Sequence, residues 1–123
     1  MCQYELGVVE ARFADIIWEN EPLTTGELVK QCEQALRWKR TTTYTVLKKL
    51  SLHGLFQLED GVVTSKLSRE DYYAGQGKQF VAKAFDGSLP AFIASFTKRN
   101  ALSEKELEQI RQLIDSIGKE QKK

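Results

Sequence analysis

The sequence has little of the chemistry that enzymes and metal sites use. It contains one histidine, His53, and two cysteines, Cys2 and Cys32. One histidine supplies neither a cluster of histidine ligands nor a Ser-His-Asp arrangement. Two distant cysteines without Cys-x-x-Cys spacing indicate neither a zinc site nor a disulfide framework. No glycine-rich phosphate loop is present either, so we expect a protein that is not an enzyme and has no metal or cofactor.

Long apolar runs are also missing. No stretch approaches the roughly 20 apolar residues that a membrane-spanning helix needs. Residues 1–10 lack the basic start and the apolar core of a secretory signal, and we therefore expect a cytoplasmic protein. A chain of 123 residues has room for one compact domain, or for a small domain with an appendage.

The net charge is small, but the charged residues are unevenly distributed. The formal net charge is only +1, which by itself argues against a nucleic-acid partner, because affinity for DNA depends on cations that neutralise phosphates. Residues 34–58, however, contain no Asp or Glu. The positive charge is concentrated in this window, which holds Arg37, Lys39, Arg40, Lys48 and Lys49.

Spacing and caps predict the first two helices. Val9, Phe13 and Ile17 share one face of a helix over residues 8–20. The motif Thr24-Thr25-Gly26-Glu27 is typical of a capping box, in which the hydroxyl and the carboxylate each bond a free N–H at the helix start. A second helix is therefore expected to begin there.

A third helix is predicted from Arg40 to about His53, with Gly54 as its stop. Its buried face is expected to consist of Thr43, Val46, Leu47 and Leu50, which follow helical spacing.

The rest of that helix carries threonines and lysines. Short hydrogen-bonding side chains let a helix approach base edges in the major groove, and neighbouring cations neutralise phosphates. Trp18 and Trp38 are interpreted as packing residues, with contact to the sugar-phosphate backbone as the alternative for Trp38. The predicted DNA-contacting residues are Trp38, Lys39, Arg40, Thr41, Thr42, Tyr44, Thr45, Lys48, Lys49 and, beyond the helix, Lys66.

A β-hairpin is predicted next. Residues 55–59 and 62–67 are strand-like runs on either side of Asp60-Gly61, a strong two-residue turn signal. Three helices followed by a hairpin form a winged helix-turn-helix. Because the tip is acidic, phosphate contact by the wing would depend on Lys66 or Arg69 instead.

From Ser68 onward the pattern is helical again. We predict a mostly α-helical fold with a small β-hairpin: a winged-helix DNA-binding domain over residues 1–67 and a helical dimerisation domain over residues 68–123. A tail of this size is close to the limit below which a core is marginal on its own, so its apolar stripes are expected to be buried in a homodimer. The predicted dimerisation residues are Phe80, Phe85, Leu89, Phe92, Ile93, Phe96, Leu107, Ile110, Ile114 and Ile117.

Motifs in a fixed order carry a family resemblance. They are Glu10 with Ile17-Trp18-Glu19, Pro22-Leu23-Thr24 with Glu27-Leu28, the run from Thr42 to Leu50, Phe85-Asp86-Gly87-Ser88-Leu89, Phe96-Thr97-Lys98, and Leu102-Ser103 with Glu106-Leu107 and Leu113. With these the chain resembles the penicillinase repressor family, the BlaI/MecI-type winged-helix regulators that include a copper-sensing CopY branch. The resemblance implies a homodimer that binds a palindromic operator and represses transcription, with control of β-lactam resistance genes and a membrane receptor-protease as possible extensions.

Two departures from the family pattern limit what the resemblance implies. The β-lactam-responsive members are cut at an Asn-Phe bond in the penultimate helix, and the matching pair here, the possible cleavage position, is Ser95-Phe96. The copper-sensing branch carries a pair of Cys-x-Cys motifs near its C-terminus, and residues 118–123 contain no cysteine. We therefore expect no copper sensing through that motif.

The alternative function is a winged-helix protein-interaction module that dimerises without reading DNA.

Overall fold

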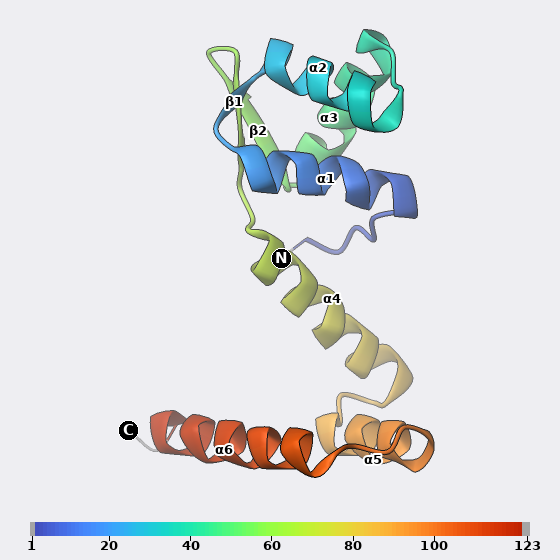
Figure 1. Ribbon diagram of the computed structural model, residues 1–123, viewed down its shortest axis with the longest axis vertical. Helices are drawn as coiled ribbons and strands as arrows, with labels where there is room; N and C mark the ends of the chain where they lie inside the picture. The colour runs from blue at the N-terminus through green and yellow to red at the C-terminus, as the bar shows by residue number, and fades with distance from the viewer. Residues whose placement is uncertain (1, 122–123) are drawn as a thin grey trace. The chain divides into compact units, whose positions relative to one another are not determined.

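The computed structural model describes residues 2–121, so residue 1 and residues 122–123 of the predicted domains lie outside it. The predicted mostly α-helical fold with a small hairpin is confirmed (Figure 1). In chain order the elements are α1 (Val8–Asn20), β1 (Leu23–Thr24), α2 (Thr25–Leu36), α3 (Arg40–Leu52), β2 (Phe56–Glu59), β3 (Val62–Ser65), α4 (Arg69–Ala84), α5 (Leu89–Arg99) and α6 (Glu104–Gln121).

The sheet has one strand that the sequence did not predict. Its order is β1-β3-β2, and both pairings are antiparallel. The added strand, β1, pairs Leu23 with Val63 and Thr24 with Val62. Two residues are too few to show alternation, and Thr24 is also the cap of α2, so local sequence indicated only the helix start.

The start of α2 follows the predicted capping box, and α1 begins with a cap that the sequence analysis did not predict. At α2 the Thr24 hydroxyl accepts a 3.1 Å hydrogen bond from the Glu27 N–H, and the Glu27 carboxylate accepts a 3.2 Å bond from the Thr24 N–H. At α1 the Glu10 carboxylate accepts a 3.0 Å bond from the Gly7 N–H. These bonds satisfy backbone donors that have no partner within the helix.

The core lies where α1, α2, α3 and the sheet meet. Trp18 and Trp38 pack as interpreted from the sequence: the Trp38 ring stacks on Phe13 with centroids 5.4 Å apart, and the Trp18 indole N–H donates a 2.9 Å hydrogen bond to the Leu67 carbonyl. The buried apolar side chains are Phe13, Ala14, Ile17, Leu23, Leu28, Cys32, Leu47, Leu50, Leu55, Phe56, Val63 and Tyr72.

The start of α4 belongs to this core. Tyr72 of this helix is buried, whereas its neighbour Tyr73 is 39% exposed. The chain divides into two compact units between Phe80 and Val81, whereas the sequence placed its domain boundary after Leu67. The difference arises because Tyr72 packs near Trp18, with ring centroids 5.9 Å apart.

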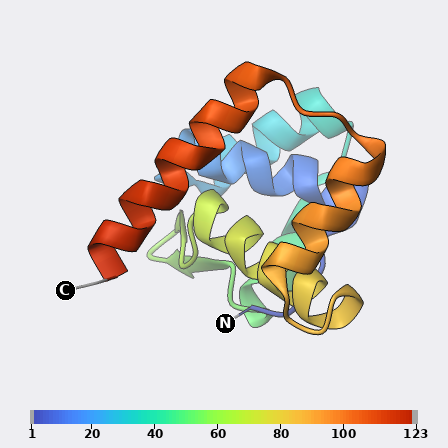
Figure 2. The same ribbon diagram turned by 90° about the horizontal axis from the view of Figure 1, so that it is seen from below.

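The second unit contains the end of α4 together with α5 and α6. Serine caps open both later helices: the Ser88 hydroxyl accepts from the Ala91 N–H at 3.1 Å, and the Ser103 hydroxyl from the Glu106 N–H at 3.1 Å. None of the described residues of α5 or α6 is buried. Figure 2 shows α6 running apart from α5, and its apolar residues Leu113, Ile114 and Ile117 are exposed.

Candidate nucleic-acid interface

The packing of α3 fixes which of its side chains face outward. Thr43, Leu47 and Leu50 are buried as predicted, and Val46 is half-buried. Thr43 is polar, and its hydroxyl donates a 3.4 Å hydrogen bond to the Lys39 carbonyl. The inward face of α3 therefore packs against the core without leaving the Thr43 hydroxyl unsatisfied.

Three of the predicted DNA-contacting threonines are exposed together on the outer surface of α3. They are Thr41, Thr42 and Thr45. The Thr45 hydroxyl donates a 2.9 Å hydrogen bond to the Thr41 carbonyl. While this bond holds, Thr45 presents a methyl group and hydroxyl lone pairs outward, a surface suited to a thymine methyl or to an amino group on a base edge.

Tyr44 connects α3 to the start of α2. Hydrogen bonding with the Thr25 side chain, and then with Arg40, lowers the pKa of the Tyr44 hydroxyl. The Arg40 guanidinium lies 5.7 Å from the centre of the Tyr44 ring, a cation–π arrangement. Tyr44 is half-buried, so it is held between two helices rather than projecting freely.

The two adjacent lysines of α3 differ in their partners. Lys49 lies 3.0 Å from a carboxylate oxygen of Glu10 and 5.3 Å from the centre of the Tyr4 ring. Hydrogen bonds with Tyr4 and Glu10 raise the pKa of Lys49. Lys48 is exposed and forms no ion pair with any described carboxylate. The structure therefore leaves Lys48 as the more available cation, although sequence spacing assigned both to one surface.

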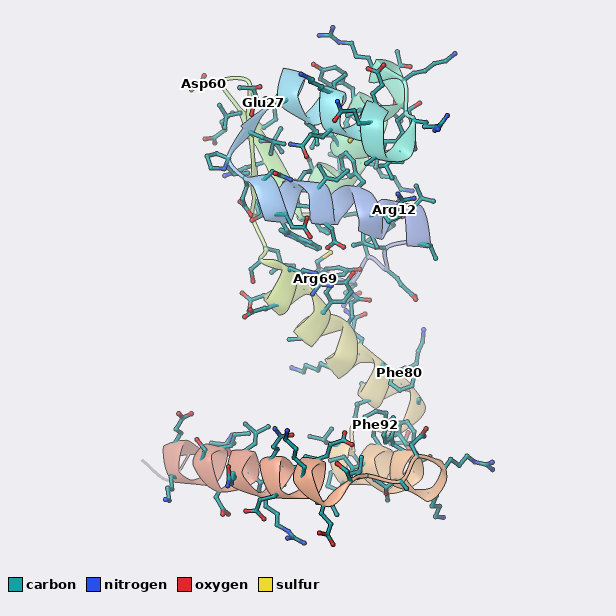
Figure 3. The ribbon with its side chains drawn as sticks, viewed as in Figure 1. Arg12, Glu27, Asp60, Arg69, Phe80 and Phe92 are labelled. Carbon is teal, nitrogen blue, oxygen red and sulfur yellow. The ribbon has the colours of Figure 1, made fainter. Side chains whose placement is uncertain are left out.

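The wing tip is acidic and anchored. Asp60 and Gly61 both have positive φ, at 51° and 75°, as the predicted Asp-Gly hairpin turn requires. The Gly61 carbonyl accepts a 3.1 Å hydrogen bond from the Thr25 N–H. Asp60 and Glu27 consequently lie at the same end of this unit (Figure 3), where their charge disfavours close approach of phosphate.

The two cations proposed for the wing lie away from its tip. Lys66 is exposed beside a cavity of about 360 Å³ that Cys2, His53 and Gly54 also line. Arg69 forms a 3.1 Å ion pair with Asp15. Lys66 is therefore close to the C-terminal end of α3 and not to the hairpin turn.

Sequence reasoning missed a hydrogen-bonded cluster around Tyr4. Its hydroxyl donates to both carboxylate oxygens of Glu10, at 2.7 and 2.9 Å, and its ring stacks on His53 with centroids 4.1 Å apart. The acid-free window pointed to Lys49 but could not show its partner, because Glu10 lies on a different helix.

The predicted dimerisation residues are distributed over the second unit and the end of the first. Phe85 and Phe92 contact each other with ring centroids 5.5 Å apart, and these two residues and Ile110 are half-buried. Leu113, which sequence analysis did not select, is 58% exposed. The remaining predicted residues are exposed: Phe80, Leu89, Ile93, Phe96, Leu107, Ile114 and Ile117.

Other kinds of site find no support in the part of the chain that the structure describes. Over residues 2–121, no group of three or more His, Cys, Asp or Glu side chains is placed to hold a metal ion. Within the same range no helix is both long and apolar enough to cross a membrane. Burial raises the pKa of the Cys32 thiol, consistent with a core residue.

The sequence resembles known proteins over most of its length. The sequence model of the family described as Penicillinase repressor matches residues 6–116. The chain is 24% identical over 115 residues to the penicillinase repressor of Bacillus licheniformis, with 90% of each chain covered. It is 22% identical over 116 residues to the methicillin resistance regulatory protein MecI of Staphylococcus aureus strain Mu50, covering 91% of this chain and 94% of that protein. It is also 22% identical over 121 residues to a penicillinase repressor of Staphylococcus aureus, covering 95% and 96%. Because the family match spans most of the sequence, this chain belongs to the penicillinase repressor family, a family of transcriptional repressors.

Proposed function

We propose that this protein represses transcription by binding operator DNA through the outer face of α3. The observation that carries the proposal is the composition of that face: exposed threonines beside Lys48, a cation without a carboxylate partner among the described residues. Such a face combines short groups for base edges with charge for phosphates. Family membership supports the same function, and the proposal includes a cytoplasmic location.

The proposed binding unit is a homodimer on a palindromic operator. Support comes from the second unit, in which α5 and α6 leave large apolar side chains exposed, including Phe96 and Ile114. Two such units can bury these side chains against each other, and two-fold symmetry then presents two copies of α3 to two half-sites about one helical turn apart.

The regulated genes are proposed to be of the kind that the relatives' names indicate, namely β-lactam resistance genes. The proposal does not include cleavage, because Ser95 stands where the cleaved members have Asn. Ser95 and Phe96 are nevertheless both exposed on α5. Measuring the mass of the protein recovered from cells with and without a β-lactam would separate release by a membrane receptor-protease from release without cleavage.

Binding to the promoter DNA of the protein's own operon tests the main proposal. A labelled promoter fragment should be retarded in a gel at lower protein concentration than a scrambled fragment. Lys48→Glu should weaken binding to both fragments, because it places an acid beside phosphates. Lys105→Glu on α6 is the matched control, since Lys105 is exposed and lies outside α3.

Equal retardation of promoter and scrambled DNA, or full binding by Lys48→Glu, would contradict the proposal. A chain that forms a dimer but retards neither fragment at low salt would favour the protein-interaction module. Low salt is chosen because non-specific DNA affinity is strongest there and weakens steeply as salt rises. A DNA-binding protein should therefore retard at least one fragment, and an interaction module should retard neither.

A further inference from the structure

The segment before α1 lies against α4 as an extended strap. Residues 2–6 form this strap, which in Figure 1 runs toward α1 beside the start of α4. The even-numbered residues are half-buried and pack against the core, and the odd-numbered ones are exposed: Cys2, Tyr4 and Leu6 against Gln3 and Glu5. A period of two is typical of an extended chain with one face inward. The strap is therefore docked on the first unit along its whole length.

Side chains on one face of α4 hold the strap by its main chain. The Tyr72 hydroxyl donates a 2.7 Å hydrogen bond to the Tyr4 carbonyl. The Gln76 side-chain amide donates to the same carbonyl at 3.3 Å, and the Gln79 amide donates to the Cys2 carbonyl at 3.4 Å. The three donors follow the spacing i, i+4 and i+7, which places them on one side of the helix.

These bonds are spread along α4 and not gathered at one point. Residues 72 and 79 are roughly 10 Å apart along a helix axis. A helix held at one point can pivot, whereas a helix held at two points this far apart resists pivoting. Arg69 and Tyr73 also attach α4 to the first unit, through Asp15 and Trp18, but these contacts lie near the start of the helix. The strap extends the attachment along α4.

The inward side chain of the strap contacts α3. The Tyr4 ring stacks on His53, the residue that ends α3, with centroids 4.1 Å apart. The Lys49 ammonium lies 5.3 Å from the centre of the same ring. The Tyr4 hydroxyl donates to Glu10 at 2.7 Å, and Glu10 pairs with Lys49 at 3.0 Å. The strap is therefore bound to α4 by its main chain and to α3 by a side chain.

The position of α4 in the chain gives this connection a consequence. The chain passes from the first unit to the second within α4, between Phe80 and Val81. The second unit carries the apolar side chains through which the proposed dimer forms. Any pivoting of α4 on the first unit would therefore move α3 relative to the dimer contact.

We propose that the strap fixes the direction of α4 relative to α3, so that the dimer selects operators by the spacing between their half-sites. This proposal rests on the proposed function, a homodimer on a palindromic operator. One added base pair turns a half-site by about 35° and moves it by about 3.4 Å. A dimer with a fixed α4 cannot follow that change without strain, whereas one with a pivoting α4 can. Gln76 and Gln79 are then positioning residues that act through the strap.

Gln76→Ala combined with Gln79→Ala removes the two outer bonds to the strap. The core residue Tyr72 is kept, and alanine favours a helix at least as much as glutamine does. The matched control is Gln3→Ala combined with Gln109→Ala, the same chemical change at two exposed positions.

Cleavage after the exposed residue Glu5 by a glutamate-specific protease reports whether the strap is docked. Release of the peptide that ends at Glu5, followed by mass spectrometry, should be faster in the Gln76/Gln79 variant than in the control. Equal rates would mean that the two glutamines do not hold the strap, and would overturn the proposal.

The main test uses the full-length protein and the palindrome that it protects in its own promoter. Fluorescence anisotropy would compare this duplex, the same duplex with one base pair added between the half-sites, and a single half-site. The unmodified protein should bind the original spacing roughly tenfold more tightly than the lengthened one, an effect like that of one mismatched base pair. In the Gln76/Gln79 variant the ratio should fall to about threefold or less, while affinity for the single half-site stays unchanged.

Tyr4→Leu releases the strap from the side of α3 and should lower the same ratio. Adding it to the Gln76/Gln79 variant should lower the ratio no further, because two breaks in one connection are not additive. Urea unfolding followed by tryptophan fluorescence identifies conditions in which each variant is folded, and the affinities are compared there.

A spacing ratio that stays unchanged in both the Gln76/Gln79 variant and Tyr4→Leu would overturn the strap's role and leave the proposed function standing. So would a promoter-specific protein that binds both spacings equally. An equal loss of half-site and full-site affinity in the Gln76/Gln79 variant would mean that the glutamines act on the DNA-binding surface, and would also overturn the proposal. Equal binding of promoter and scrambled DNA by the unmodified protein would instead overturn the proposed function itself.

Discussion

The Tyr72 hydroxyl on α4 donates a 2.7 Å hydrogen bond to the main-chain carbonyl of Tyr4. The same hydroxyl accepts a 2.9 Å bond from the Leu6 N–H. Tyr72 is 2% exposed, so water cannot easily replace these bonds. The segment before α1 is thereby attached to α4, while the Tyr4 side chain contacts Glu10 of α1 and His53 at the end of α3. One short segment therefore joins the three helices.

Tyr72→Phe should destabilise the first unit. The substitution keeps the ring but leaves the Leu6 N–H without its partner and the Tyr4 carbonyl with only the longer 3.3 Å bond from the Gln76 amide, at a cost of about 1–3 kcal/mol. Urea unfolding followed by tryptophan fluorescence would measure the free energy of unfolding. Tyr73→Phe is the control, since Tyr73 is 39% exposed. Equal stability of the Tyr72→Phe variant and the unmodified protein would show that the pair of bonds contributes nothing.

Glu10 should give the protein a stability that is lost in acid. Burial alone would raise the pKa of its carboxyl, but hydrogen bonds from Gly7, Tyr4 and Lys49 outweigh burial and lower the pKa from its ordinary 4.5. A group whose pKa is lowered on folding stabilises the folded state above its unfolded pKa, and that contribution disappears as pH falls through the folded value. Glu10→Gln should therefore lower the free energy of unfolding by about 1–2 kcal/mol at pH 7.

The difference between Glu10→Gln and the unmodified protein should shrink as pH falls below about 4.5, because Glu10 of the unfolded chain then takes up a proton while that of the folded chain stays charged. It should disappear once pH is below the lowered pKa of the folded state. Urea unfolding at pH 7 and at about pH 3.5 would measure it. A difference that stays constant across this range would contradict the assignment of the lowered pKa to Glu10.

Features that depend on neighbouring residues could be predicted from the sequence, and those that depend on distant ones could not. The capping box of Thr24 and Glu27 and the Asp-Gly turn at Asp60 are local arrangements, in which a few consecutive residues fix the backbone. The buried face of α3 also follows from spacing within one helix. The burial of Tyr72 could not be predicted in this way. It depends on a hydrogen bond to Tyr4, which lies far from Tyr72 in the sequence.

The candidate interface shows the same division. Charge composition alone identified α3 and the acid-free window around it. It could not separate Lys48 from Lys49, since their difference arises from Glu10 on α1. Arg37 was likewise visible as a cation in the window, but its left-handed backbone and its position at the cavity depend on the meeting of α2 and α3.

Lys48 and Lys49 should contribute unequally to DNA binding. Lys48→Gln should reduce affinity for a random duplex and lower the slope of log affinity against log salt by about 0.9, the value for one lost phosphate contact. Lys49→Gln should change the slope less, because the charge of Lys49 is already paired with Glu10. Fluorescence anisotropy over a range of salt measures both. Equal slopes for the two variants would mean that the Lys49 ion pair opens on DNA.

The exposed apolar face of α6 should be needed for dimerisation. Ile110→Asp with Ile114→Asp places two charges on that face, where Ile114 is 57% exposed in the single chain. Burying an isoleucine side chain contributes about 1.5–3 kcal/mol, so losing two should raise the dimer dissociation constant by roughly 100-fold or more. Light scattering coupled to gel filtration would show the double variant with the mass of a monomer.

Val8→Asp, at a position on α1 that is 84% exposed, is the control and should remain dimeric. A double variant that keeps the mass of a dimer at micromolar concentration would place the subunit contact elsewhere, and Leu89 and Phe96 of α5, also exposed, would be the next residues to change.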